Sequence, residues 1–281
     1  MLVSRKIGKI SRGCVTLSLG EKRLFLLDMD GTLYLGERLF PGVWEFLRAV
    51  KNCGGRYLFL TNNSSRGIQG YLEKLARLGI DAAEEDFLTS TDATIRCLQK
   101  EYPTARCYVA GTRSFYQQLQ ENGIDVTDMP DDKVTMVLSG YDTELTYEKL
   151  VSASRLLTDG ADWIATNPDW VCPTEWGSVP DCGSICQMLT TATGREPRFI
   201  GKPRPEMVYL ALEKTGFSPA QALMVGDRIY TDIAAGVNAG IDTAFVLSGE
   251  GTKADMERFD VHPTWVFDDI MALWRRWEAK R

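Results

Sequence analysis

The stretch that most constrains this chain is Leu-Phe-Leu-Leu-Asp-Met-Asp-Gly-Thr-Leu at residues 24–33. A short apolar run with charge before it and glycine after it is typical of a buried parallel strand rather than a helix. Asp28 and Asp30 follow at its carboxyl end, where open α/β sheets bind their ligands. Because side chains alternate along an extended chain, we expect both carboxylates to point to the same face.

Two neighbouring acids at a strand end need an explanation. Without a partner they would repel each other and resist ionisation, so a bound cation is the simplest account of Asp28 and Asp30. The alternative is an acidic turn in which Asp30 and Gly31 only reverse the chain. The sequence downstream decides between the two readings.

Composition narrows the class of protein. With 281 residues, 44% of them hydrophobic, the chain can bury one large core or two smaller ones. Its net charge of -6 argues against a nucleic-acid or anionic membrane partner. Seven cysteines without a secretory leader indicate free thiols in a reducing compartment, so we predict a cytoplasmic protein. No apolar window reaches the length of a membrane span.

A second polar signal follows the next predicted strand, residues 56–60. Thr61, Asn62 and Asn63 come at its end, with two serines after them and a predicted helix at 66–78. Hydroxyls and amides before a helix start can bind an anion, together with the first amides of the helix. The alternative is a helix-capping run, and the two readings are compatible.

The third signal is Lys202, between a strand ending near Phe199 and a predicted helix at 205–215. Pro203 and Pro205 stiffen this turn, so the lysine stays near the strand end. On its own, a lysine beside proline would be a solvated loop charge.

The fourth signal repeats the design of the first. An apolar strand at 223–225 ends in Gly226 and Asp227, and Asp232 follows in the next loop or first helical turn. Turn and N-cap duties are the alternative for these two acids.

The middle of the chain keeps alternating strand and helix. We predict strands at 106–110, 134–138 and 162–166, and helices at 114–121, 147–157 and 183–193. The segments suited to phosphate chemistry resume only after this region. We therefore predict a Rossmann-like α/β parallel-sheet core, residues 21–103 and 196–281, with an inserted α/β cap at 104–195 and an N-terminal extension at 1–20.

Asp169, Trp170 and Trp176 lie in a proline- and glycine-rich loop of the predicted cap. Large aromatic rings in such a loop either pack the cap core or line a substrate pocket, and the sequence leaves both readings open.

The four signals resemble, in order, the four motifs of the haloacid dehalogenase (HAD) superfamily of phosphatases. More narrowly, segments 31–36, 61–65, 166–169, 201–203 and 226–233 resemble subfamily IIA, the NagD and p-nitrophenylphosphatase-like group. One departure is Val-Pro-Asp-Cys at residues 179–182, where many relatives have a glycine-rich stretch. That departure puts the geometry of the substrate loop in question.

The resemblance implies a role for each motif. Asp28 would attack phosphorus and form an aspartyl-phosphate, and Asp30 would act as general acid and then general base. Thr61 and Lys202 would hold the phosphoryl oxygens. The expected substrate-binding residues are Thr61, Asn62, Asn63, Asp169, Trp170 and Lys202. The expected Mg²⁺ site is Asp28, the backbone carbonyl of Asp30, and Asp227. Asp232 would orient the waters bound to the metal, or Lys202.

The leading hypothesis is therefore a magnesium-dependent phosphatase that hydrolyses a small phosphorylated metabolite of the sugar phosphate, nucleotide or pyridoxal phosphate class. A phosphotransferase or mutase using the same aspartyl-phosphate is one alternative. A non-catalytic protein that binds a phosphorylated ligand is another, although intact Asp28, Asp30, Lys202 and Asp227 count against it. A homodimer formed through the cap is a further hypothesis.

Overall fold

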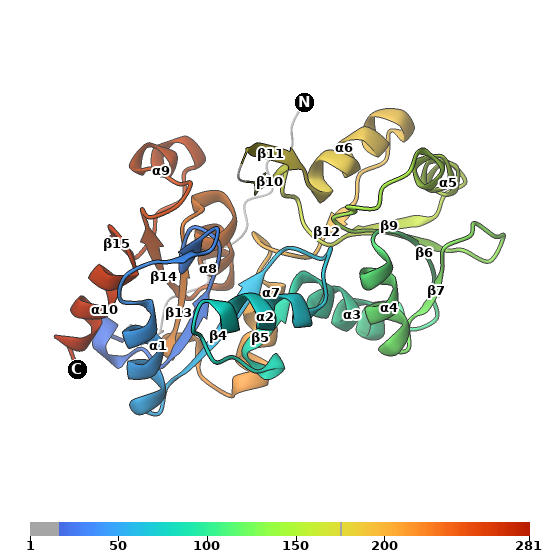
Figure 1. The fold of residues 1–281 in the computed structure, drawn as a ribbon. Coiled ribbons are helices and arrows are strands. Elements are labelled where there is room, and N and C mark those ends of the chain that lie inside the picture. Colours follow the sequence, from blue (N-terminus) through green and yellow to red (C-terminus); the bar gives the residue numbers. More distant parts are fainter. Residues whose placement is uncertain (1–16, 175) are drawn as a thin grey trace, which may run out of the picture.

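The computed structural model describes residues 17–174 and 176–281, which form two parallel sheets lying side by side (Figure 1). The larger sheet has the strand order β15-β14-β13-β1-β4-β5. Its strands are β1 (Leu24–Leu27), β4 (Arg56–Thr61), β5 (Phe87–Thr89), β13 (Ala222–Gly226), β14 (Asp242–Val246) and β15 (Trp265–Phe267). The predicted opening strand is thus the central one, flanked by β13 and β4.

Helices cover both faces of this sheet because β1 is apolar on both sides. Phe25 and Leu27 pack in one hydrophobic cluster with α1 (Val43–Asn52), α2 (Ile68–Arg77) and α10 (Ile270–Glu278). Leu24 and Leu26 pack in the opposite cluster, which includes α3 (Ser90–Glu101), α7 (Glu206–Thr215) and α8 (Ala234–Ala239). A strand buried on both faces is what a continuous apolar run predicts.

The smaller sheet has the order β12-β9-β8-β6-β7. Its strands are β6 (Arg106–Ala110), β7 (Asp125–Thr127), β8 (Met136–Ser139), β9 (Asp162–Ala165) and β12 (Arg198–Phe199). The helices α5 (Tyr147–Thr158) and α6 (Cys182–Thr193) pack on one face, and α4 (Arg113–Glu121) packs with α3 on the other. The predicted fold class, a parallel α/β core with a second α/β unit, is confirmed.

The strand β12 shows where the second unit ends. It pairs with β9, and the hydrogen bond from Gly201 N to Thr166 O, 2.7 Å long, continues the association. The sequence predicts residues 196–281 as part of the core, yet this strand lies in the smaller sheet. A two-residue edge strand leaves too short an apolar pattern to show which sheet it joins.

The remaining elements are short. Two antiparallel hairpins are formed by β2 (Tyr34–Leu35) with β3 (Arg38–Leu39) and by β10 (Val171–Thr174) with β11 (Gly177–Pro180). The second hairpin stands where the sequence predicts an irregular loop. A 3₁₀ turn covers Leu19–Glu21, a π-helical turn covers Ile229–Ile233, and α9 spans Lys253–Phe259. Residues 1–16, most of the predicted extension, lie outside the described residues.

Within residues 17–174 and 176–281, no helix combines the length and the apolar character that a bilayer crossing requires.

Candidate active site

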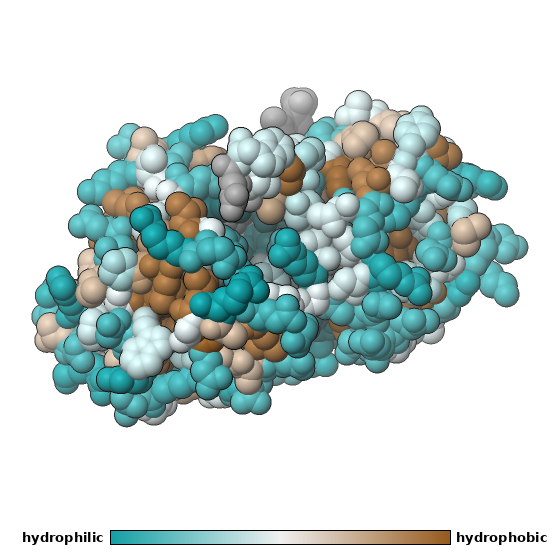
Figure 2. Space-filling model, in the orientation of Figure 1, coloured by the Kyte–Doolittle hydropathy of each residue, from teal (hydrophilic) through white to brown (hydrophobic). Residues whose placement is uncertain are grey.

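A pocket of about 210 Å³ lies between the two sheets, and both contribute to its lining. Figure 2 shows the corresponding hollow between the two halves of the molecule, rimmed by hydrophilic side chains. Its floor is the carboxyl edge of the larger sheet, beside β1. The chain leaves β1 toward β4 on one side and returns to β13 on the other, so this is the switch point at which such sheets bind ligands.

Three carboxylates meet at this floor. One oxygen from each of Asp28, Asp227 and Asp232 lies within 4.8 Å of the other two. Asp232 reaches the group because it packs against Gly226, where any side chain would collide with it. Asp227 is held by hydrogen bonds from Glu250 N (2.7 Å) and Thr32 Oγ1 (3.3 Å).

Burial and mutual repulsion make these acids hard to ionise. Burial, reinforced by Asp232, raises the pKa of Asp227 to about 6. The same two causes raise the pKa of Asp28 well above its ordinary value. A bound divalent cation relieves both penalties, and an all-oxygen donor set is the one that Mg²⁺ prefers. The residues at this floor therefore fit the predicted metal.

Lys202 is the cation at the centre of the site. Its Nζ lies 2.6 Å from Asp28 Oδ1 and 2.6 Å from Asp232 Oδ1, and it donates to Leu60 O at 3.2 Å. Burial alone would lower the pKa of Lys202, but Asp232 and Asp28 more than offset that effect and raise it. The alternative reading of Lys202 as a solvated loop charge is excluded, because the residue is 2% exposed.

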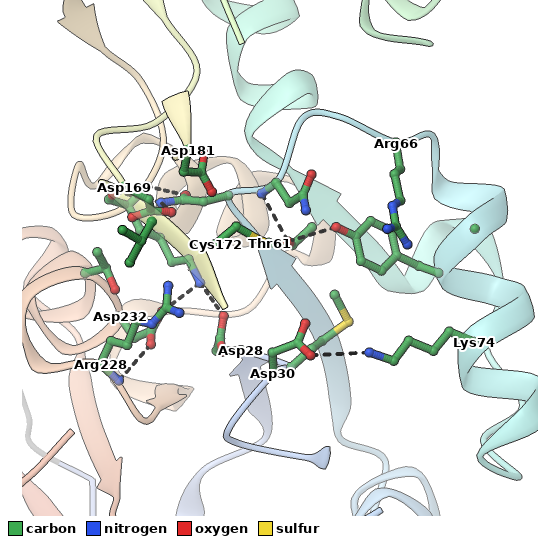
Figure 3. Close-up of a pocket in the computed structure, with 18 residues that line it drawn as sticks. Asp28, Asp30, Thr61, Arg66, Lys74, Asp169, Cys172, Asp181, Arg228 and Asp232 are labelled. Carbon is green, nitrogen blue, oxygen red and sulfur yellow. Dashed lines mark hydrogen bonds and ion pairs between the residues drawn. The ribbon is translucent and has the colours of Figure 1, made fainter. Parts of the chain in front are cut away.

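Asp30 takes a different direction from Asp28. Its Oδ1 lies 3.3 Å from Lys74 Nζ, a contact drawn in Figure 3, and its Oδ2 accepts a hydrogen bond from Tyr34 at 3.4 Å. Asp30 does not belong to the cluster of Asp28, Asp227 and Asp232. The alternation of an extended strand does not apply to these residues, because β1 ends at Leu27, but both carboxylates line the same pocket. Asp30 still lines the pocket, with a side chain that is 54% exposed.

The polar run after β4 forms a turn rather than a helix cap. Thr61 Oγ1 accepts from Asn63 N at 3.2 Å, and Asn63 Oδ1 accepts from Ser65 N at 2.9 Å. The helix α2 begins later than predicted, after Gly67, which supplies no side-chain cap. Thr61, Asn62 and Asn63 all line the pocket.

Asp169 is a residue of the smaller unit that lines the pocket. Its Oδ2 accepts hydrogen bonds from Asn62 Nδ2 (3.0 Å) and Asn167 Nδ2 (3.1 Å). Its Oδ1 is buried and has no hydrogen-bond partner, and burial raises the pKa of this carboxyl. Figure 3 shows Asp169 and Asp181 on the opposite side of the pocket from Asp30.

The two tryptophans neither pack the core of the smaller unit nor line the pocket, the two readings that the sequence left open. Trp170 is 57% exposed and Trp176 is 78% exposed, so neither ring packs the core of the smaller unit. Neither belongs to the pocket lining either, where Val171 and Cys172 of the hairpin stand instead. The prediction of Trp170 as a substrate-binding residue is not supported by this geometry.

Four charged residues of the pocket lining were missed from the sequence: Arg66, Lys74, Asp181 and Arg228. Arg228 directly follows Asp227, and its Nε lies 2.9 Å from Glu250 Oε2. Asp181 lies in the segment that departs from the family pattern, and burial, with Asp169 nearby, raises its pKa to about 6. Both residues lie beside segments that the sequence analysis singled out, but nothing in the sequence indicated that their side chains point into the pocket.

Comparison with known proteins agrees with this geometry. Residues 25–125 match the family of haloacid dehalogenase-like hydrolases, and residues 199–273 match a HAD-hydrolase-like family. The chain belongs to the HAD hydrolases. The chain is 37% identical to an acid sugar phosphatase of Staphylococcus aureus, over 89% of this chain and 96% of that protein. The predicted HAD-type phosphatase is thereby confirmed.

Two solved structures are similar over most of their length. A 4-nitrophenylphosphatase from Thermotoga maritima is 40% identical with a TM-score of 0.85, covering 92% of this chain and 98% of that one. A glycerol phosphate phosphatase from Mycobacterium tuberculosis, in complex with calcium, is 32% identical with a TM-score of 0.84, covering 92% of this chain and 76% of that one. These relatives, together with a structure described as a putative NagD protein (39% identical, TM-score 0.82, covering 89% of this chain and 96% of that one), confirm the NagD and p-nitrophenylphosphatase-like character of this HAD hydrolase.

Proposed function

We propose that this HAD hydrolase is a Mg²⁺-dependent phosphatase that cleaves small organic phosphate monoesters through an aspartyl-phosphate on Asp28. The observation that carries the proposal is the position of Asp28 at the pocket floor, with Oδ1 2.6 Å from Lys202 Nζ. A carboxylate at the end of a central strand, next to a buried cation, is placed to attack an incoming phosphoryl group.

The chain's own residues account for both halves of the reaction. A carboxylate oxygen of Asp28 forms a bond to phosphorus while the bond from phosphorus to the leaving oxygen breaks. Asp30 gives that oxygen a proton, then takes one from the water that hydrolyses the aspartyl-phosphate. Lys202 and Thr61 hold the phosphoryl oxygens, and such alignment and charge neutralisation are most of what phosphoryl transfer needs.

Asp28 and Asp227 would hold the metal, with the backbone carbonyl of Asp30, while Asp232 lies close enough to bind it or to orient its waters. Bound there, Mg²⁺ would offset the negative charge of the phosphoryl group and of the attacking carboxylate.

The far wall of the pocket, formed by Asp169 and Asp181, favours a leaving group that carries hydroxyls. Asp169 Oδ1 is a buried acceptor without a donor, and such an atom costs free energy until a ligand supplies one. A sugar or polyol phosphate offers that donor. The names of the relatives from Staphylococcus aureus and Mycobacterium tuberculosis point to the same class.

A panel of small phosphates, assayed with and without Mg²⁺, tests this function. We expect sugar and polyol phosphates to be hydrolysed fastest, and only with the metal present. Phosphate transferred to a sugar acceptor faster than to water would favour the phosphotransferase alternative. Binding of phosphate esters without any turnover would favour the non-catalytic one.

A cytoplasmic location and a homodimer through the smaller unit stay predictions from the sequence.

A further inference from the structure

The side chain of Asn62 has no donor hydrogen left for the phosphoryl oxygens of a substrate. Its Nδ2 donates to Lys202 O (2.9 Å) and to Asp169 Oδ2 (3.0 Å), and its Oδ1 accepts from Lys202 N (2.8 Å). Both amide hydrogens are therefore used inside the protein, and the residue is 6% exposed. The sequence prediction of Asn62 as a substrate-binding residue does not explain these contacts.

Two of the three contacts go to the backbone of a single residue, Lys202. A side-chain amide that engages both the N–H and the C=O of one residue holds that residue as a neighbouring strand would. Lys202 needs such support, because it follows directly after the point where β12 leaves the smaller sheet. Gly201 leaves room for the amide, since any side chain at this position would collide with Asn62 Oδ1.

The position of this backbone matters because of what the lysine side chain reaches. Its Nζ lies 2.6 Å from both Asp28 and Asp232, a bridge that a small displacement would break. Lysine has four rotatable bonds, so its ammonium group is placed accurately only when both ends of the side chain are held. The carboxylates hold one end and Asn62 holds the other.

The third contact ties the same amide to the smaller unit. Asp169 Oδ2 takes one hydrogen of Nδ2, so the amide plane is set by Lys202 and by a residue of the smaller unit together. Ser90 Oγ donates to the backbone carbonyl of Asn62 at 2.6 Å, a contact that does not involve the amide.

We infer that Asn62 is a positioning residue: it holds the backbone of Lys202 so that the ammonium group bridges Asp28 and Asp232, and it does not contact the substrate itself. The inference rests on the proposed function in one respect, namely that Lys202 binds the phosphoryl group.

A double-mutant cycle tests this inference. The probe is orthovanadate, which mimics the phosphoryl group in transfer and therefore binds tightly enough to measure in weakened variants. Its dissociation constant is measured by calorimetry, with Mg²⁺ present, for the wild type, Asn62→Ala, Lys202→Ala and the double variant. Asn62→Ala should weaken binding about tenfold or more in the wild type but less than about twofold in the Lys202→Ala background, because groups that act through one another are not additive.

Ser90→Ala is the matched control. It removes a buried hydrogen bond from the same residue but leaves the amide of Asn62 in place. Its vanadate affinity and its turnover of p-nitrophenyl phosphate should stay within about twofold of the wild type, although its thermal midpoint falls as a lost buried hydrogen bond requires. Circular dichroism checks each variant for folding, and Asn62→Ser replaces Asn62→Ala if the alanine variant does not fold.

Two results would overturn the inference. Equal loss of vanadate affinity in both backgrounds would mean that Asn62 contacts the phosphoryl group directly. A lower thermal midpoint with unchanged affinity and turnover would mean that the contacts serve folding alone. The wild type, assayed in parallel, separates this test from the proposed function: a wild type that binds vanadate but hydrolyses no phosphate ester contradicts the function and leaves the positioning result readable.

Discussion

The strand ends of the larger sheet and the hairpin β10–β11 are built in opposite ways, although both border one pocket. Beside these strand ends, Asp227, Asp232 and Lys202 are almost fully buried and are held by groups from several different elements. The hairpin is an isolated two-stranded ribbon with exposed residues along both strands, and Trp176 at its turn is 78% exposed.

This difference in burial and support suits the two regions to different tasks, catalysis and substrate selection. A parallel strand between two neighbours cannot shift without breaking two ladders, so groups at its end keep their geometry. A two-stranded ribbon is marginally stable by itself, and its residues can be exchanged at little cost to the fold. We therefore expect catalysis to depend on the strand ends and substrate preference to depend on the smaller unit. Five predictions test that division.

The largest effect should come from Asp28→Asn. The change is nearly isosteric and removes the attacking charge, so hydrolysis of every substrate should fall to background. The thermal midpoint should hold or rise, because a buried carboxylate with a raised pKa is removed. Both are read from a steady-state assay and a melting curve. Substantial turnover, with phosphate trapped on another residue, would show that the nucleophile lies elsewhere.

Removal of the metal should have nearly as large an effect. EDTA should abolish hydrolysis of p-nitrophenyl phosphate and added Mg²⁺ should restore it, since Asp28, Asp227 and Asp232 gather at the floor of the pocket. A fully active chelated enzyme would contradict the metal-dependent mechanism.

Acidic pH should weaken Mg²⁺ binding by protonating Asp227. Its pKa is about 6, and a protonated carboxyl cannot bind Mg²⁺. Below that pH the group becomes protonated, so the Mg²⁺ concentration for half-maximal activity should rise about tenfold per pH unit, and above it the requirement should level off. A metal titration at several pH values measures this. A requirement that stayed constant down to pH 4 would rule out Asp227 as a ligand.

A smaller and more selective effect should come from the far wall. Asp169→Ala should lower kcat/KM for the preferred substrate about tenfold, the equivalent of roughly 1.4 kcal/mol. Turnover of p-nitrophenyl phosphate should change much less, because two of the three contacts of Asn62 go to Lys202 and remain. Equal losses on both substrates would assign Asp169 to catalysis and remove the distinction between the two regions.

The smallest effect should come from Trp170→Ala. The ring is 57% exposed and lies outside the pocket lining, so kcat/KM should change less than about twofold and stability by less than about 0.5 kcal/mol. A tenfold loss restricted to the preferred substrate would show that the hairpin closes over the bound molecule.

Much of this protein follows from local sequence. The apolar runs that end in Asp28, Thr61 and Asp227 specify buried parallel strands, and the carboxyl ends of such strands meet at one edge whatever the loops between them do. Within a few residues, the predicted strands and helices of both units are therefore present.

Other features depended on the tertiary structure. Asp30 turns toward Lys74 because β1 stops at Leu27, and Trp170 turns outward on a hairpin that the proline- and glycine-rich sequence did not reveal. The membership of β12 in the smaller sheet and the contacts of Asn62 with Lys202 join residues that are far apart in the chain.

The sequence by itself determined which residue types stand at the ends of which strands. The spacing of apolar residues and the glycines and prolines that end an element are local properties of a chain. Only the tertiary structure decided where each side chain points and what it contacts, because those depend on packing between segments that are distant in the chain. Asn62 illustrates both: its place after β4 can be read from the sequence, whereas its hold on Lys202, 140 residues away, exists only in the folded protein.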